Sequence, residues 1–292
     1  MLNITDCRVQ PGDCAYVIDD GTTAILHDTG FGFTGYQIAD KIEKLLGDRK
    51  LDYILLSHSH YDHAMATPYI KRKYPEAKVV AGHHAAGVFL RPGARRVMSE
   101  LDSKFAATCG IHDYECLVDE LAVDIAVYDG DIIKAGSMEF QVLNLPGHTK
   151  CSVGYYCKDL KFFISTETLG VYDGDKVIIP SYLVGVNQSL ESIDRVSKMD
   201  IRTMLSPHYG VLNEDQTRYF LSHMREASYG LAQWIKGLVE QGRSDNEIFE
   251  MFKDRFWHGE IRRMYPIDAL ILNTSIMTTL IKKELLGIEP VK

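Results

Sequence analysis

Residues 53–63 read Tyr-Ile-Leu-Leu-Ser-His-Ser-His-Tyr-Asp-His, and this stretch decides the fold that we expect for the chain. Its first four residues, Tyr53–Leu56, are a continuous apolar run, which is typical of a strand buried on both faces. Three histidines and one aspartate follow, at the point where the strand ends and a helix should begin. Imidazole and carboxylate are ligands that borderline divalent metals take, so the stretch predicts a metal site at the end of a buried strand.

The spacing of these side chains predicts how they divide between metals. His58 and His60 are two residues apart in extended backbone, so they point to the same side and can share one metal. Asp62 and His63 follow in the turn and can address a second metal. The competing interpretation is a His-rich polar surface loop. It is disfavoured because four potential ligands occur within six residues directly after a buried strand.

Strand and helix patterns alternate on both sides of this stretch. A helix is expected over residues 36–46, where apolar residues recur at helical spacing before Gly47, and another from Thr67, a capping residue that precedes Pro68. Short apolar runs bounded by turn residues predict strands over 15–18, 23–27, 79–82, 131–134, 138–143, 153–157 and 161–165. The chain is therefore expected to be a layered α/β protein.

Two segments depart from this alternation. Residues 85–127 are rich in helix formers and predict one or two inserted helices. From about residue 213 the pattern is almost purely helical, so we expect an α/β domain over 1–212 and an all-helical C-terminal extension over 213–292. Two capping boxes and a helix-opening proline mark the starts of its helices: Asn213 with Gln216, Ser244 with Glu247, and Pro266.

Composition narrows the class of protein. The 292 residues carry a formal charge of −8 without a basic block, which argues against a nucleic-acid partner. No signal peptide or membrane span is recognised, since polar residues interrupt the apolar stretch 267–281. The six cysteines form no disulfide framework and are expected to be reduced. We therefore expect a cytoplasmic protein that acts on a small molecule.

The pattern His58-x-His60-x-Asp62-His63 resembles the signature of the metallo-β-lactamase superfamily. Further motifs follow in the order of that family: Asp28-Thr29-Gly30, Pro146-Gly147-His148-Thr149 and Ser206-Pro207-His208-Tyr209-Gly210. The resemblance implies an αββα sandwich with a dinuclear metal site along the edge of two facing sheets.

The resemblance also implies a set of ligands for two divalent ions, with zinc expected and iron or manganese as alternatives. His58, His60 and His148 would hold the first metal, and Asp62, His63 and His208 the second. The family places a bridging aspartate in a Gly-Asp dipeptide, whereas this chain has Thr166-Glu167. The longer side chain of Glu167 could displace the bridge or weaken binding of the second metal. Asp173 and Asp175 are less favoured substitutes.

The reaction implied by such a centre is hydrolysis of a thioester or ester, of the acyl-CoA or acyl-glutathione type, by attack of a metal-bridging hydroxide on the carbonyl. Asp62 would also orient the hydroxide or shuttle its proton. Tyr209 could donate a hydrogen bond to the substrate or could simply pack. His27-Asp28 could orient a ligand through a hydrogen bond, and Cys151 is expected to be a structural thiol.

The helical extension is expected to cover the active-site edge or to form a homodimer contact. Its aromatic and methionine side chains would include packing residues and the lining of an apolar acyl or aryl pocket; they are Tyr219, Phe220, Met224, Trp234, Phe252, Phe256, Trp257 and Met264.

The chain also resembles, more loosely, the quinolone-signal response (PqsE-like) thioesterases of the superfamily, which have a comparable helical C-terminus. The likeness lies in His60-Tyr61-Asp62-His63, Glu167-Thr168-Leu169-Gly170 and Pro207-His208. It implies an aromatic acyl-CoA thioester as a substrate and iron as a candidate beside zinc.

Two other classes of function stay open at this point. Related folds carry iron for persulfide oxygenation, so an iron-dependent persulfide dioxygenase-like oxidoreductase is one alternative. The other is a signalling or binding module with weak residual hydrolase activity, in which Glu167 has impaired the centre and the helical extension recruits a partner.

Overall fold

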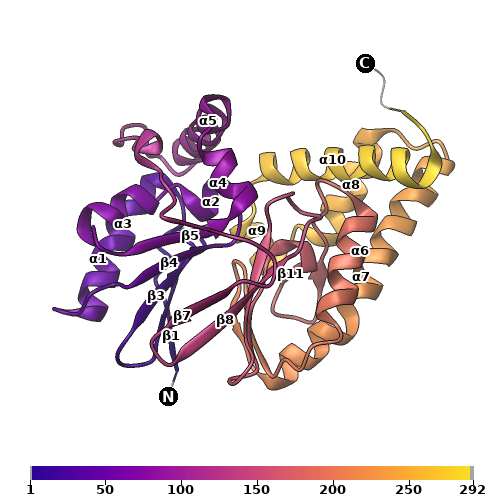
Figure 1. Ribbon diagram of the computed structural model, residues 1–292. Helices are drawn as coiled ribbons and strands as arrows, with labels where there is room; N and C mark the ends of the chain where they lie inside the picture. The colour runs from indigo at the N-terminus through magenta and orange to yellow at the C-terminus, as the bar shows by residue number, and fades with distance from the viewer. Residues whose placement is uncertain (1, 290–292) are drawn as a thin grey trace. The chain divides into compact units, whose positions relative to one another are not determined.

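The computed structural model describes residues 2–289, which form two compact units (Figure 1). The first unit contains the chain up to residue 144 together with residues 151–160. The second unit contains residues 145–150 and the chain from residue 161 onward. The domain boundary at 212/213 stays a prediction from the sequence.

A six-stranded sheet organises the first unit. Its strands, in spatial order, are β1 (Asn3–Asp6), β2 (Tyr16–Asp19), β3 (Ala24–His27), β4 (Tyr53–Leu56), β5 (Lys78–Gly82) and β6 (Ile125–Val127). β1 to β3 are antiparallel neighbours, and β2 and β3 form a hairpin. β3 to β6 run parallel. Because the ends of parallel strands lie at one edge, the residues after β3 and after β4 become neighbours.

Helices connect these strands and cover the sheet, and they are drawn in indigo to magenta in Figure 1. The helix expected over 36–46 is α1 (Gly35–Leu46), which packs Ile38, Ile42 and Leu46 into the core of the first unit. The other helical elements are η1 (Gly32–Thr34), α2 (Tyr61–Ala64), α3 (Thr67–Lys73), α4 (His83–Phe89), α5 (Pro92–Thr108) and η2 (Val118–Glu120).

Two local expectations were wrong. Thr67 is not a helix cap: Ala66 precedes α3, and the Thr67 hydroxyl instead lies 3.2 Å from that of Thr29. The expected helical insert does not extend to residue 127. Residues 125–127 instead form the strand β6, because this short run pairs with the edge of β5. A three-residue strand carries too little periodicity to be separated from a helix by pattern.

The first unit also contains an antiparallel meander of β7 (Ile132–Ala135), β8 (Met138–Asn144) and β9 (Val153–Cys157). These strands lie within one or two residues of the expected ranges. β9 is buried along its whole length, as its apolar sequence indicates.

The second unit combines a short sheet with many helices. β10 (Phe162–Ile164), β13 (Thr203–Ser206) and β14 (Gly210–Leu212) pair side by side, and β11 (Val171–Tyr172) forms a hairpin with β12 (Ile178–Ile179). The helical elements are η3 (Glu167–Leu169), α6 (Val186–Val196), α7 (Glu214–Glu240), α8 (Asp245–Phe256), α9 (Gly259–Met264) and α10 (Ile267–Leu286). The sequence analysis did not predict β1, β11 to β14 or α6.

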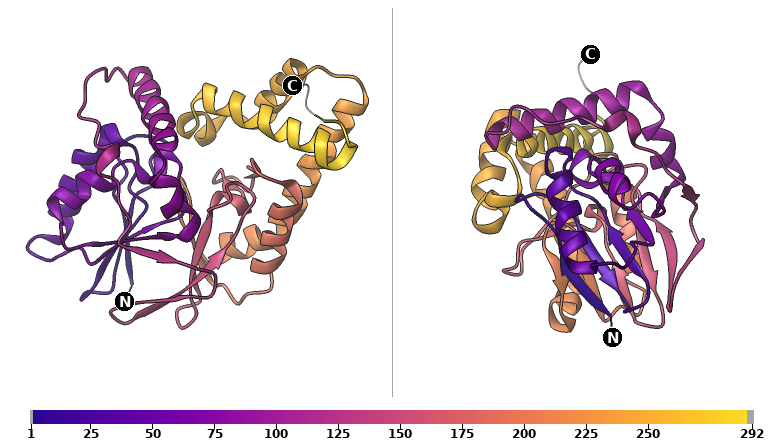
Figure 2. Two further views of the ribbon diagram at one scale, coloured as in Figure 1. Left: turned by 45° about the horizontal axis from the view of Figure 1, so that its top comes forward. Right: turned by 90° about the vertical axis from the view of Figure 1, so that its left-hand side faces the viewer.

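The helical C-terminal region is confirmed from residue 214 to residue 286. Both expected capping boxes are present, at Asn213 before α7 and at Ser244 before α8, and α10 begins directly after Pro266. Figure 2 shows these orange to yellow helices gathered together, and their apolar faces form one core that includes the fully buried Phe252 and Ile281. No helix within residues 2–289 combines the length and the apolar character needed to cross a bilayer.

A buried carboxylate in the first unit makes stability depend on pH. Asp102 accepts hydrogen bonds from the Gly32 amide (3.0 Å) and the Tyr114 hydroxyl (2.6 Å), and burial raises the pKa of Asp102 to about 7. The folded state therefore holds this proton up to about pH 7, whereas the unfolded chain releases it near pH 4. The contribution of Asp102 to the free energy of unfolding is therefore fully present below about pH 4 and is lost as the pH rises from about 4 to 7.

We predict that Asp102→Asn removes this dependence, because the amide keeps an acceptor for Gly32 and carries no charge. Between about pH 4 and 7, the free energy of unfolding of the wild type should fall relative to the variant, by on the order of 3 kcal/mol. Urea unfolding at several pH values measures this, with the exposed Asp48→Asn as control. Parallel pH profiles for wild type and Asp102→Asn would contradict it.

Candidate metal centre

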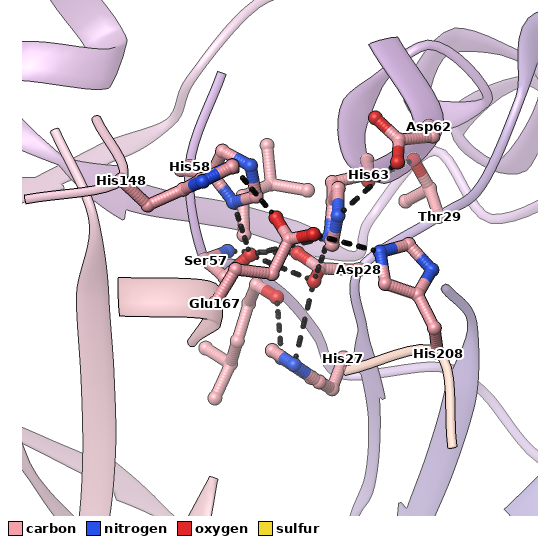
Figure 3. Close-up of polar contacts among 12 residues, drawn as sticks. His27, Asp28, Thr29, Ser57, His58, Asp62, His63, His148, Glu167 and His208 are labelled. Carbon is pink, nitrogen blue, oxygen red and sulfur yellow. Dashed lines mark hydrogen bonds and ion pairs between the residues drawn. The ribbon is translucent and has the colours of Figure 1, made fainter. Parts of the chain in front are cut away.

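The first unit gathers three of the expected histidine ligands at the end of β4. Figure 3 shows His58 and His63 there, and the His58 ring centroid lies 4.2 Å from that of His63 and 4.5 Å from that of His60. α2 begins directly after His60 and turns the chain back, so that His63 returns to His58. Asp62 lies on the same turn, with its Oδ2 3.5 Å from His63 Nε2. The unit thus holds three imidazole rings and one carboxylate, which are metal-ligand types, close together.

Asp28, at the end of the neighbouring strand β3, fixes this cluster. Its backbone adopts a left-handed conformation (φ 50°), which is uncommon for a non-glycine residue. The carboxylate accepts hydrogen bonds from the Ser57 amide (2.7 Å) and hydroxyl (2.8 Å), and His63 Nδ1 lies 2.8 Å from it. Because a carboxylate only accepts, His63 Nδ1 carries a proton, which leaves Nε2 as the position for a second proton or for a metal ion.

Electrostatics at Asp28 and His63 favour positive charge. Burial opposes ionisation of Asp28, but His27 and His63 outweigh it and hold the pKa of the carboxyl well below its usual range. Burial lowers the pKa of His63, whereas Asp62 and Asp28 raise it, and the net pKa is well above the usual histidine value. The carboxylates therefore stabilise a cation at this imidazole. A bound metal and a proton compete for that position.

The second unit gathers the other predicted ligands around Glu167, which opens the short helix η3. Glu167 Oε2 lies 2.8 Å from His148 Nε2, and Glu167 Oε1 lies 3.1 Å from His208 Nε2. His148 Nδ1 lies 2.8 Å from the backbone oxygen of Ser181, which only accepts, so this nitrogen carries the proton. His208 has a left-handed backbone (φ 61°), one of the strained conformations that cluster at functional sites.

Tyr265, between α9 and α10, is a residue of this cluster that the sequence analysis missed. Its hydroxyl donates a hydrogen bond to Glu167 Oε1 (2.8 Å), and its ring lies edge-on to that of His208, with centroids 5.7 Å apart. Tyr265 is 98 residues from Glu167 and belongs to no motif, so no local signal could have identified it. The helical extension therefore contributes directly to this half of the candidate centre.

The donor set of each cluster fits divalent metal ions. His148 Nε2 lies 2.8 Å from a Glu167 oxygen, and His63 Nε2 lies 3.5 Å from an Asp62 oxygen. Such a nitrogen–oxygen pair is satisfied by one cation, either a proton on the imidazole or a metal ion bound to both groups. Imidazole nitrogen and carboxylate oxygen are ligands of zinc and of other borderline metals.

The remaining candidates lie outside these two clusters. The Tyr209 ring packs edge-on against Tyr172 (5.0 Å), and its hydroxyl accepts from Gln216 (3.2 Å), so its proposed contact with substrate stays a prediction. Cys151 is buried, and its sulfur lies 3.3 Å from the Ser59 hydroxyl. The Asp173 carboxylate caps its own turn by accepting from two backbone amides, as a turn residue does.

Most of the aromatic and methionine residues named in the extension pack its core. The buried ones are Phe220, Met224, Phe252, Phe256 and Met264, and the tryptophans Trp234 and Trp257 are partly buried against them. A small cavity of about 20 Å³ does lie beside the Glu167 cluster, lined by Ser181, Tyr265 and Phe252 among others. The helices of this unit therefore both form a core and reach the predicted ligands.

Comparison with known proteins identifies the family. The model of the metallo-beta-lactamase superfamily matches residues 14–208, which is more than half of the chain. The chain belongs to this superfamily. The expected fold class, an α/β metallo-β-lactamase fold with an all-helical C-terminal extension, is confirmed.

Curated relatives are similar over part of their length. A hydroxyacylglutathione hydrolase of Nitrobacter winogradskyi is 30% identical over 158 residues, covering 52% of this chain and 49% of the relative. The acyl-coenzyme A thioesterase MBLAC2 of Homo sapiens is 25% identical over 189 residues, covering 59% of this chain and 64% of the relative. The chain spans about half the length of the first of these relatives.

Solved structures share the fold at low identity. A metallo-beta-lactamase family protein from Thermus thermophilus has a TM-score of 0.62 at 16% identity, covering 93% of this chain and 88% of that one. The sec-alkylsulfatase Pisa1 from a Pseudomonas species has a TM-score of 0.61 at 14% identity, covering 100% of this chain and 52% of that one. These likenesses show the fold and nothing of the substrate.

We predict that Asp28→Asn weakens metal binding by the full-length protein about 10- to 100-fold, because an amide cannot hold His63 in the same way. Competition with a chromophoric chelator measures the affinity, and Asp48→Asn, an exposed aspartate of the same unit, is the matched control. An unchanged affinity in Asp28→Asn would show that the carboxylate does not orient the ligand.

We predict a smaller effect for Tyr265→Phe. The variant keeps the ring beside His208 and removes the hydrogen bond to Glu167, so metal affinity should fall severalfold, by the net value of one ordinary hydrogen bond, about 1 kcal/mol. Thermal unfolding of the metal-free protein serves as control. A loss of stability without any change in metal affinity would make Tyr265 a packing residue.

Proposed function

We propose that the chain is a metal-dependent hydrolase of thioesters, with esters as the related alternative. The observation that carries the proposal is the pair of preorganised donor clusters, each with an imidazole nitrogen held next to a carboxylate oxygen. Its membership of the superfamily supports the same conclusion. The names of its relatives describe hydrolases that act on acyl groups carried by glutathione or coenzyme A.

The proposal assigns two divalent ions to the expected ligands. His58, His60 and His148 would hold one ion, Asp62, His63 and His208 would hold the other, and Glu167 would add a carboxylate ligand. Zinc is our first choice, with iron or manganese as alternatives, because the imidazole and carboxylate donors suit all three metals. Two such ions supply a hydroxide nucleophile at neutral pH and polarise the acyl carbonyl.

The side chains then hold and move protons around the reacting carbonyl. Asp62 is partly exposed, unlike the buried His63 beside it, and its carboxylate can accept the proton of the attacking water and release it to solvent. Tyr265 holds Glu167 by its hydrogen bond, so the longer carboxylate keeps one orientation. A thiolate leaves without a strong general acid because a free thiol has a pKa of about 8.5, and this favours thioesters over amides.

We also propose that the substrate is a small molecule and that the protein is located in the cytoplasm. The C-terminal helices are the candidate homodimer contact, since α10 carries the exposed side chains Ile271 and Leu272.

The function is tested by assay of the metal-analysed protein against acyl-CoA and acyl-glutathione thioesters, lactones and bis-p-nitrophenyl phosphate. Thioester turnover that follows metal content is the expected result. Oxygen consumption with glutathione persulfide, in place of hydrolysis, would favour a dioxygenase. The absence of turnover across the panel in fully metal-loaded protein would contradict the proposal and leave a binding module.

We predict that His60→Ala lowers metal content and abolishes hydrolysis together, because it removes an imidazole ligand. His112→Ala, which replaces an exposed histidine outside the cluster, should change neither quantity. Elemental analysis and the thioester assay are made on the same preparations. Full activity of His60→Ala at unchanged metal content would remove His60 from the site.

A further inference from the structure

A second cavity in the second unit has the composition of a ligand site. It has a volume of about 450 Å³, within the range of small-molecule pockets, and lies between the turn after β11 and the helices α7 and α8. Two of its lining residues, Lys176 and Arg255, are exposed cations from different elements. Neither has a carboxylate partner among residues 2–289. Two cations against the single carboxylate of Glu226 give the cavity a net positive charge, which favours an anionic ligand.

The wall of the same cavity carries two aromatic rings and hydrogen-bond acceptors, and Lys176 Nζ lies 5.9 Å from the centroid of the Tyr219 ring. Tyr219 and His223 stack on one another, with ring centroids 4.0 Å apart and planes inclined by 20°. His223 Nδ1 lies 2.8 Å from the backbone oxygen of Tyr219, so this nitrogen carries the proton and Nε2 can accept a hydrogen bond. The carboxylate of Glu226 lies on the cavity wall one turn further along α7.

A glycine in the wall of the cavity leaves room for a ring of the ligand. Gly230 lines the cavity on α7, and a Cβ built there would meet no atom within 4 Å. Glycine within a helix costs about 1 kcal/mol relative to alanine, so packing against other protein atoms does not explain it. The open helix surface instead admits a flat ligand group next to the stacked Tyr219 and His223.

We propose that this cavity binds the phosphorylated adenosine of coenzyme A. Phosphate would pair with Lys176 and Arg255, the base would lie on the aromatic surface, and the ribose hydroxyls would donate to Glu226. The proposal rests on the thioesterase function above and sharpens it, since coenzyme A carries a nucleotide and glutathione does not. Acyl-CoA is thereby the preferred substrate class.

The cavity lies within reach of the predicted metal ligands. Ile178 lines it, and Ser181, whose backbone oxygen accepts from His148 Nδ1, is three residues further along the chain. Three residues span about 10 Å at most. The long arm of coenzyme A separates its nucleotide from the thioester, so a nucleotide in this cavity leaves the acyl group free to reach His148.

The test is calorimetric titration of the full-length, metal-loaded protein with adenosine 3′,5′-bisphosphate. Phosphate, adenosine and glutathione are titrated as separate arms. We expect the nucleotide to bind more tightly than any of these. Lys176→Gln and Arg255→Gln should each weaken binding about tenfold, and Gly230→Trp should block it. Lys236→Gln, a lysine of α7 outside the cavity, is the matched control and should bind as the wild type does. Circular dichroism checks that each variant is folded.

The outcomes separate this proposal from the proposed function. The cavity variants should raise KM for acyl-CoA and leave hydrolysis of acyl-N-acetylcysteamine thioesters, which lack a nucleotide, unchanged. Absence of nucleotide binding by the wild type, or undiminished binding in both charge variants, overturns the cavity site even if thioesters are hydrolysed. Tighter binding of glutathione than of the nucleotide also overturns it. Nucleotide binding that the variants weaken, without any thioester turnover, supports the cavity site and refutes the proposed function.

Discussion

The buried carboxylate of Asp28 is the constraint on which the first half of the candidate centre depends. A charge this deeply buried is tolerated only where donors surround it, and the Ser57 amide, the Ser57 hydroxyl and His63 Nδ1 provide them. These contacts tie the end of β3 to the end of β4 and to the first turn of α2. The orientation of a predicted metal ligand is thus a consequence of satisfying one buried charge.

The second cluster is organised around a carboxylate as well. Glu167 is longer by one methylene than the aspartate that the superfamily resemblance implies, and the added length is matched by a partner from the helical extension. Tyr265 donates to one oxygen of Glu167, while the other oxygen faces His148. The extension therefore does more than add a core to the second unit: it restrains the side chain that departs most clearly from the family pattern.

Sequence reasoning succeeded where residues act through local pattern. The run Tyr53–Leu56 gave the bounds of β4, and the capping boxes at Asn213 and Ser244 gave the starts of α7 and α8, because strand burial and helix caps are decided by adjacent residues. It failed for β11 to β14, which are two to four residues long and depend on pairing partners. Tyr265 was missed for a related reason, since its role arises from a contact 98 residues away.

The central proposal is that the predicted histidine and carboxylate ligands hold two metal ions. Anomalous X-ray diffraction from crystals of the metal-loaded protein, recorded at the absorption edge of the bound metal, tests it most directly. We expect two anomalous peaks, each within bonding distance of the ligands proposed for it. A single peak, or no peak in protein saturated with metal, would contradict the proposal.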